Sequence, residues 1–180
     1  MNTELLPFSG ESARKAAEIM RAGGIVGIPT ETVYGLAADA RNESAVRSIF
    51  QAKGRPQDNP LIVHISCIEQ LPPLVREIPD LALKIAEKYW PGPLTMIFPK
   101  SDLIPSATSG GLDTVAVRMP QSPAARAIID ACGFPLAAPS ANLSGSPSPT
   151  TAQHVMNDMN GRIPLIIDGG DCSCGVESTV

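Results

Sequence analysis

The sequence predicts an α/β fold, in which helices lie outside a mixed or largely parallel sheet. Short runs of Ile, Val, Leu and Ala alternate with helix-type patterns over most of the 180 residues, and this alternation is typical of α/β domains. The chain also contains 15 glycines and 18 prolines, which separate these segments and favour short, stiff connections. The length suits one domain.

Each element follows from its local pattern. Residues 12–22 carry apolar side chains at helical spacing until Gly23 and Gly24 end the helix. The apolar run 25–28 is typical of a buried strand, and Pro29 closes it. The same criteria predict further helices at 43–52, 79–90 and 122–133, and further strands at 61–65, 94–98, 115–119, 136–138 and 165–167.

Composition argues against several classes of protein. The net charge is −4 and aromatic residues make up 4%, whereas nucleic-acid-binding domains need a basic face and often stacking rings. Residues 1–8 lack the pattern of a secretory leader, and no apolar stretch reaches the ~18 residues of a membrane helix. We therefore expect a cytoplasmic protein without membrane contact. Its four cysteines are expected to be free thiols: Cys67, Cys132, Cys172 and Cys174.

The common nucleotide-binding and nucleophile motifs are absent. The sequence contains no G-x-x-x-x-G-K-[ST] loop, no G-x-G-x-x-G after a strand and no G-x-S-x-G elbow. Two histidines are too few for a histidine-built metal site. If this protein binds a nucleotide, it therefore uses a different phosphate-binding motif.

The first candidate site segment, Pro29–Leu36, directly follows a predicted buried strand. Thr30, Glu31 and Thr32 place two hydroxyls beside a carboxylate, at the edge where α/β sheets usually bind ligands. A capped turn into a helix explains the same residues without a ligand.

The second segment, residues 53–60, contains two cations around a glycine. Lys53 and Arg55 could bind an anion, because arginine offers a planar fork and lysine a point charge to phosphate. They equally suit the negative end of the helix that precedes them.

Two further polar residues lie in apolar strands. Arg118 needs a carboxylate partner, from a ligand or from the protein itself, because an unpaired charge there is costly. His64 is a ligand contact or a hydrogen-bonded core residue. Small polar side chains in residues 139–145 either line a phosphate or ribose or form a plain turn. The polar stretch 140–151 is interpreted as a site loop rather than a domain boundary.

Six segments together resemble YrdC-like threonylcarbamoyl-AMP synthases, in the order that this family has them. They are PTETVYGL, KGRPQDNPLIVHI, PGPLT, VAVRMP, APSANLSG and ESTV. The resemblance extends from about residue 24 to residue 180, and the second segment is more similar to the long, two-domain form. It implies a twisted, open, mixed sheet with a large concave, positively charged cleft.

The resemblance also implies roles for individual residues. Lys53 and Arg55 would be catalytic and would bind ATP, together with Asn59, Thr114, Ser140, Asn142 and Ser148. The L-threonine pocket would consist of Thr32, His64, Arg118, Ala138 and Ser178. No protein side chain would bind a metal directly, Mg²⁺ would arrive with ATP, and no tightly bound organic cofactor is expected.

Members of this family condense L-threonine, bicarbonate and ATP, release pyrophosphate and supply the product for threonylcarbamoyladenosine in transfer RNA. The resemblance implies that the product passes to the tRNA threonylcarbamoyl-transfer machinery, and it leaves room for weak contact with tRNA. Because family members continue beyond ESTV, residues 1–180 are expected to form a single catalytic domain that is incomplete at its C-terminus. Two alternatives remain: a non-catalytic module that binds tRNA or double-stranded RNA, and carbamoyl transfer as in hydrogenase-maturation proteins.

Overall fold

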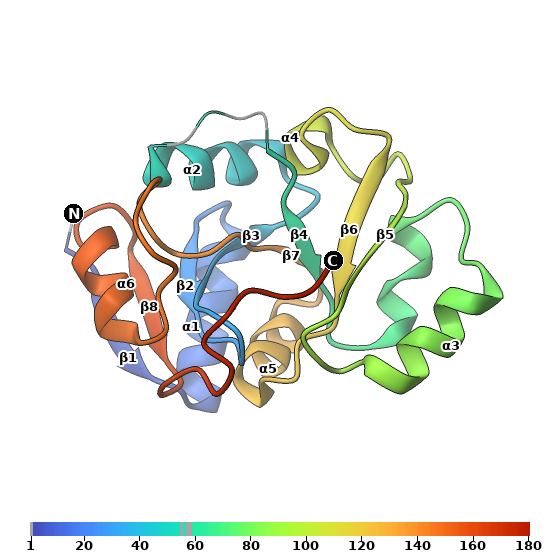
Figure 1. The fold of residues 1–180 in the computed structure, drawn as a ribbon. Coiled ribbons are helices and arrows are strands. Elements are labelled where there is room, and N and C mark those ends of the chain that lie inside the picture. The colour runs from blue at the N-terminus through green and yellow to red at the C-terminus, as the bar shows by residue number, and fades with distance from the viewer. Residues whose placement is uncertain (1, 55, 57–58) are drawn as a thin grey trace.

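A mixed sheet of eight strands forms the centre of the molecule (Figure 1). The computed structural model describes residues 2–54, 56 and 59–180. The strand order is β1-β8-β2-β3-β7-β4-β6-β5. The pairs β1–β8, β8–β2 and β4–β6 are parallel, and the other neighbours are antiparallel. The strands are β1 (Glu4–Pro7), β2 (Val26–Ile28), β3 (Gly35–Asp39), β4 (Ile62–His64), β5 (Thr95–Pro99), β6 (Thr114–Arg118), β7 (Leu136–Ala137) and β8 (Leu165–Asp168).

The helices start and end where the sequence supplies caps. Ser9 and Ser12 form a capping box at the start of α1, and Asn42 accepts a hydrogen bond from Ala45 N at the start of α2. Gly54 ends α2 in the left-handed region, with φ of 62°. The helices are α1 (Gly10–Arg21), α2 (Glu43–Lys53), α3 (Asp80–Tyr89), α4 (Ser106–Ser109), α5 (Pro123–Cys132) and α6 (Ala152–Met159), with 3₁₀ turns η1 (Ile68–Gln70) and η2 (Pro72–Leu74).

Two clusters of buried aliphatic side chains hold the sheet and helices together. One lies between the sheet and the pair α1 and α5, and includes Met20, Ile28 and Ile128. The other extends across the opposite face under α2 and α4, and includes Ile49 and Val117. Burial of these side chains supplies the main driving force for folding. Both clusters consist mainly of Ala, Ile, Leu and Val, as the scarcity of aromatic residues suggests.

The predicted α/β fold with a mixed sheet is confirmed. Every predicted strand and long helix is present, with bounds that differ by at most two residues. The alternative of a capped turn into a helix at Pro29–Leu36 is wrong, since this segment leads into β3, which turns back antiparallel to β2. The patterns also missed β1, β3, α4, α6 and both 3₁₀ turns.

No helix in the described part of the chain is both long and apolar enough to cross a membrane. Across the same residues, no three His, Cys, Asp or Glu side chains come together as a metal-binding group.

Candidate ligand pocket

A small pocket that contains several polar side chains lies where β4 and β6 end. His64 and Arg118 are the last residues of these parallel strands and are register partners, so both side chains project from one edge of the same face. The pocket has a volume of about 90 Å³, which holds several water molecules and suits a small ligand better than a nucleotide. Its lining comprises Thr30, Thr32, Val33, Gly35, Ile62, His64, Arg118, Ala138, Pro139, Ser140, Glu177 and Ser178.

Arg118 is the buried cation of this pocket. Its side chain is 3% exposed and forms an ion pair with Glu31, in which Nη2 lies 2.5 Å from Oε1. Nη1 donates to Thr32 Oγ1 at 2.9 Å, and Nε donates to the carbonyl of Gly92 at 3.2 Å. The internal carboxylate partner is therefore present, and Arg118 still faces the pocket.

Hydroxyl groups of the loop between β2 and β3 form a short network next to Arg118. Thr30 Oγ1 lies 3.0 Å from Thr32 Oγ1 and donates to the carbonyl of Val33 at 2.6 Å. It also accepts from the backbone N–H of Thr32 at 3.2 Å. These bonds of the Thr30 hydroxyl hold the loop in place and so position Thr32 beside the guanidinium.

His64 forms a neutral wall of the pocket. Burial and the nearby charge of Arg118 lower its pKa from 6.5 to about 3, so the ring is uncharged near neutral pH. Nδ1 lies 3.3 Å from the carbonyl oxygen of Ile62, to which it donates in the neutral ring. His64 therefore offers hydrogen bonding and shape to a ligand, but no charge.

Residues 172–178 close another side of the pocket. Backbone N–H groups of Cys172 and Cys174 donate to the carbonyls of Thr150 and Glu31, at 2.9 and 2.8 Å. Ser178 Oγ lies 2.8 Å from Thr95 Oγ1 of β5. The segment thus crosses the molecule from the end of β8 to β5 (Figure 1), and it brings Ser178 to Arg118 and Thr32.

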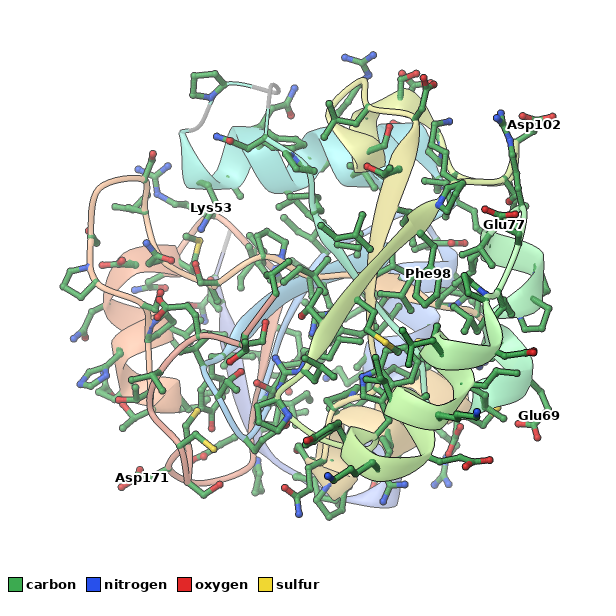
Figure 2. The ribbon with its side chains drawn as sticks, turned by 45° about the vertical axis from the view of Figure 1, so that its right-hand side comes forward. Lys53, Glu69, Glu77, Phe98, Asp102 and Asp171 are labelled. Atoms are coloured by element: carbon green, nitrogen blue, oxygen red, sulfur yellow. The ribbon has the colours of Figure 1, made fainter. Side chains whose placement is uncertain are left out.

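Lys53 lies behind the pocket, at the end of α2. Figure 2 shows its side chain directed from the helix toward the body of the molecule, where it is 3% exposed. Its ammonium donates to the carbonyl of Ser140, and to the carbonyl and Oδ1 of Asn142 at 2.7 and 3.3 Å. Because Ser140 also lines the pocket, a buried cation lies one residue away from the cavity.

The loop that carries Ser140 follows β7 and lies close to β3. Ala141 N donates to the carbonyl of Tyr34 at 2.8 Å, and Gly35 forms a bridge with Ser140. A Cβ atom on Gly35 would lie 3.2 Å from Ala138 Cβ, so glycine permits this close approach.

All five residues predicted for the amino-acid pocket line this cavity. Ser140, which was predicted as an ATP contact, lines it as well. The other predicted nucleotide contacts in the described part of the chain do not line this cavity. Asn59 is exposed, and Thr114 lies at the opposite end of β6 from Arg118, about 13 Å away at the usual rise per residue. Ser148 donates to Glu177 Oε1 at 2.5 Å. Arg55 lies outside the described residues.

The sequence-based prediction did not assign roles to Glu31, Thr30 and Glu177. Glu31 is buried and bonded to Arg118, whereas Glu177 is exposed at the pocket. In the sequence, Glu31 could be recognised as a site residue only because its carboxylate stands between two threonines directly after a buried strand. The pairing with Arg118 spans 87 residues and requires the fold.

The site is therefore a small pocket with a buried arginine, backed by a buried lysine at one edge of a mixed sheet, and its charge suits a small anionic ligand. The family model Sua5_yciO_yrdC, described as "Telomere recombination", matches residues 18–180. The chain therefore belongs to the Sua5/YciO/YrdC family, which confirms the resemblance inferred from the six segments.

Several relatives carry the name threonylcarbamoyl-AMP synthase. The protein of Pyrococcus abyssi is 57% identical over 167 residues, which cover 93% of this chain and 49% of the relative. The protein of Bacillus subtilis is 51% identical over 179 residues, which cover 99% and 52%. The chain thus spans about half the length of these two relatives. The protein of Vibrio cholerae is 35% identical over 161 residues, which cover 88% and 86%.

Solved structures agree with this assignment. P. abyssi Sua5 complexed with L-threonine superposes with a TM-score of 0.97 at 53% identity, covering 99% of this chain and 54% of that one. Escherichia coli YciO superposes with a TM-score of 0.84 at 22% identity, covering 94% and 85%, and shows the fold alone.

Proposed function

We propose that this chain carries the site of a synthase that makes L-threonylcarbamoyl-AMP from L-threonine, bicarbonate and ATP and releases pyrophosphate. The observation that carries the proposal is the pocket in which Arg118, Thr32, His64 and Ser178 converge beside Lys53. The names of the relatives, and the threonine complex of P. abyssi Sua5, support the same reaction.

The pocket offers each group of L-threonine a partner of suitable chemistry. The three bonds of Arg118 within the described protein use three of its five N–H groups, which leaves two for the carboxylate of the amino acid. His64, Thr32 and Ser178 line the remaining walls and can bind the amine and the hydroxyl.

The reaction brings together two anions, because both the carbamate that attacks and the triphosphate that it attacks are negatively charged. The amine of threonine combines with bicarbonate to a carbamate and water, and a carbamate oxygen then attacks the α-phosphorus of ATP while pyrophosphate leaves. Negative charge develops on the phosphate oxygens in the transition state, so cations that face the phosphates lower the activation barrier of the attack. Correct placement of the three substrates provides much of the remaining acceleration. No covalent nucleophile is required.

We assign the phosphates to the surface around Lys53 and Arg55, with Asn59, Thr114, Ser140, Asn142 and Ser148 as further ATP contacts. Lys53 already holds the 140–142 segment, so it can shape the phosphate site and supply charge to it. Mg²⁺ would be carried by the triphosphate. When bound, it would neutralise phosphate charge.

The product would pass to the machinery that transfers the threonylcarbamoyl group to tRNA. A cytoplasmic location follows from that role, and any direct contact with tRNA would be weak, given the net charge of −4.

Pyrophosphate release from ATP, measured with and without L-threonine and bicarbonate, tests this proposal. Release that requires both substrates is the expected result. Turnover of carbamoyl phosphate without threonine would replace the proposal with carbamoyl transfer. Salt-dependent RNA binding, without affinity for ATP or threonine in calorimetry, would replace it with an RNA-binding module.

A further inference from the structure

Glu31 joins three separate parts of the site. Its Oε1 accepts from Arg118 Nη2 at 2.5 Å, and its Oε2 accepts from the backbone N–H of Ser122 at 3.2 Å. Its carbonyl oxygen accepts from Cys174 N at 2.8 Å. The residue therefore contacts the end of β6, the start of α5 and the segment that closes the pocket.

These contacts keep Glu31 ionised. Burial alone would raise the pKa of its carboxyl group, but the charge of Arg118 and the hydrogen bonds to the carboxylate lower it below 4.5. The side chain is 6% exposed, so withdrawal from Arg118 would leave two buried opposite charges unpaired, at a high cost in free energy.

A carboxylate on the ligand-binding arginine has two conceivable roles. It either occupies the arginine until a ligand replaces it, or it holds the arginine in place while the ligand binds to other N–H groups. The second role fits the contacts better, because both oxygens of Glu31 are engaged and the bonds of Arg118 to described residues use only three of its five N–H groups.

We propose that Glu31 is a positioning residue, which fixes the guanidinium of Arg118 so that its two remaining N–H groups face the carboxylate of the amino-acid substrate. This inference rests on the function proposed above. Glu31 itself does not touch the substrate in this arrangement. It acts through Arg118, and it also ties Arg118 to Ser122 and Cys174.

Glu31→Gln tests the proposal with little change in volume. One oxygen becomes an NH₂ group, which cannot accept, while Arg118 Nη2 and Ser122 N both donate. One of the two bonds is therefore lost. Glu31→Asp keeps the charge but shortens the side chain, and it serves as the conservative variant. Glu43→Gln is the matched control, because it breaks an exposed carboxylate–arginine pair on α2.

The readout is the Kd of L-threonine and of ATP for each variant by calorimetry, with thermal unfolding to show that each variant is folded. We expect Glu31→Gln to raise the Kd of L-threonine roughly tenfold or more, the effect of one lost charged hydrogen bond, and to change the Kd of ATP less than twofold. Glu31→Asp should give an intermediate Kd, and Glu43→Gln the wild-type value.

Three results would overturn the positioning role. Unchanged or tighter L-threonine binding in Glu31→Gln would show that the carboxylate only competes with the substrate for Arg118. Equal losses for threonine and ATP would indicate a purely structural role, as would failure of both Glu31 variants to fold. If the wild-type protein binds neither ligand, the proposed function itself fails, a result distinct from any difference among variants.

Discussion

Ser148 shares a hydrogen bond of 2.5 Å with Glu177, which lines the pocket. The hydroxyl of Ser148 donates to the carboxylate and lowers the pKa of Glu177. The bond connects the loop after β7 to the segment that closes the pocket, so a ligand that uses Ser148 must compete with a carboxylate of the protein.

The first prediction concerns this competition. Glu177→Gln should lower the Kd of ATP roughly two- to fivefold, because it removes one negative charge near the phosphates, an effect of about 1 kcal/mol at 4 Å in water. Calorimetry measures the change, and Glu18→Gln, exposed on α1, is the control. Weaker ATP binding in Glu177→Gln would show instead that the carboxylate assists the nucleotide.

The second prediction concerns Lys53. Lys53→Met should raise the Kd of ATP roughly tenfold or more and leave that of L-threonine closer to wild type. It should also lower the free energy of unfolding by about 1–3 kcal/mol, because the buried carbonyls of Ser140 and Asn142 lose a donor. Calorimetry and urea denaturation measure the two effects. Lys15→Met removes an exposed lysine as a control, and equal changes in both variants would disprove a special role for Lys53.

The third prediction concerns the pH dependence of stability. His64 binds a proton near pH 6.5 in the unfolded chain but only near pH 3 in the folded protein. Between these values the unfolded state holds more protons, so the free energy of unfolding falls as the pH falls, by at most about 1.4 kcal/mol per pH unit.

Urea denaturation at pH 6.5 and pH 5 should therefore show a smaller loss of stability for His64→Asn than for wild type, by about 1–2 kcal/mol. His154→Gln changes an exposed histidine and should keep the wild-type pH dependence. Identical slopes for all three proteins would mean that His64 is not buried as a neutral ring.

The fourth prediction concerns Tyr34, whose side chain is fully buried. Its hydroxyl donates to the carbonyl of Gly170 at 2.7 Å and accepts from Gly169 N at 3.2 Å. Tyr34→Phe should lower the free energy of unfolding by about 1–3 kcal/mol, because both backbone groups lose their partner. Urea denaturation compares it with Tyr89→Phe, which changes a half-exposed ring. A stable Tyr34→Phe would mean that water replaces the hydroxyl.

The fold was predictable where a segment has one buried face or a strong start and stop signal. The helices α1, α2 and α5 have both, whereas α3 buries only Ala86 and follows Pro79 without a side-chain cap. Helix α2 begins at Glu43, as predicted, and ends one residue beyond Ala52. Strand β3 was not predicted because the segment GLAAD is short and has mostly small side chains, and its first four residues are all buried. It therefore lacks the polar–apolar alternation of a half-exposed strand.

The candidate site was predictable only in part. Sequence patterns identified Arg118 as a charge within an apolar strand and Lys53 as one of two candidate anion-binding cations, and the family resemblance placed Thr32, His64 and Ser178 with Arg118. No local pattern could identify Glu31 as the partner of Arg118, or the carbonyls of Ser140 and Asn142 as acceptors for Lys53, because these contacts join segments 87 to 89 residues apart. Roles in catalysis stay predictions.

The position of β8 between β1 and β2 has a consequence for how this chain folds. Strand β8 pairs with Glu4–Pro7 on one side and with Val26 and Gly27 on the other, so the first two strands cannot complete their pairing until residues 165–168 are made. At ribosomal speed this interval is on the order of ten seconds. Such distant pairings slow folding and leave strand edges open to wrong partners. We therefore expect the nascent chain to depend on chaperones more than its size alone suggests.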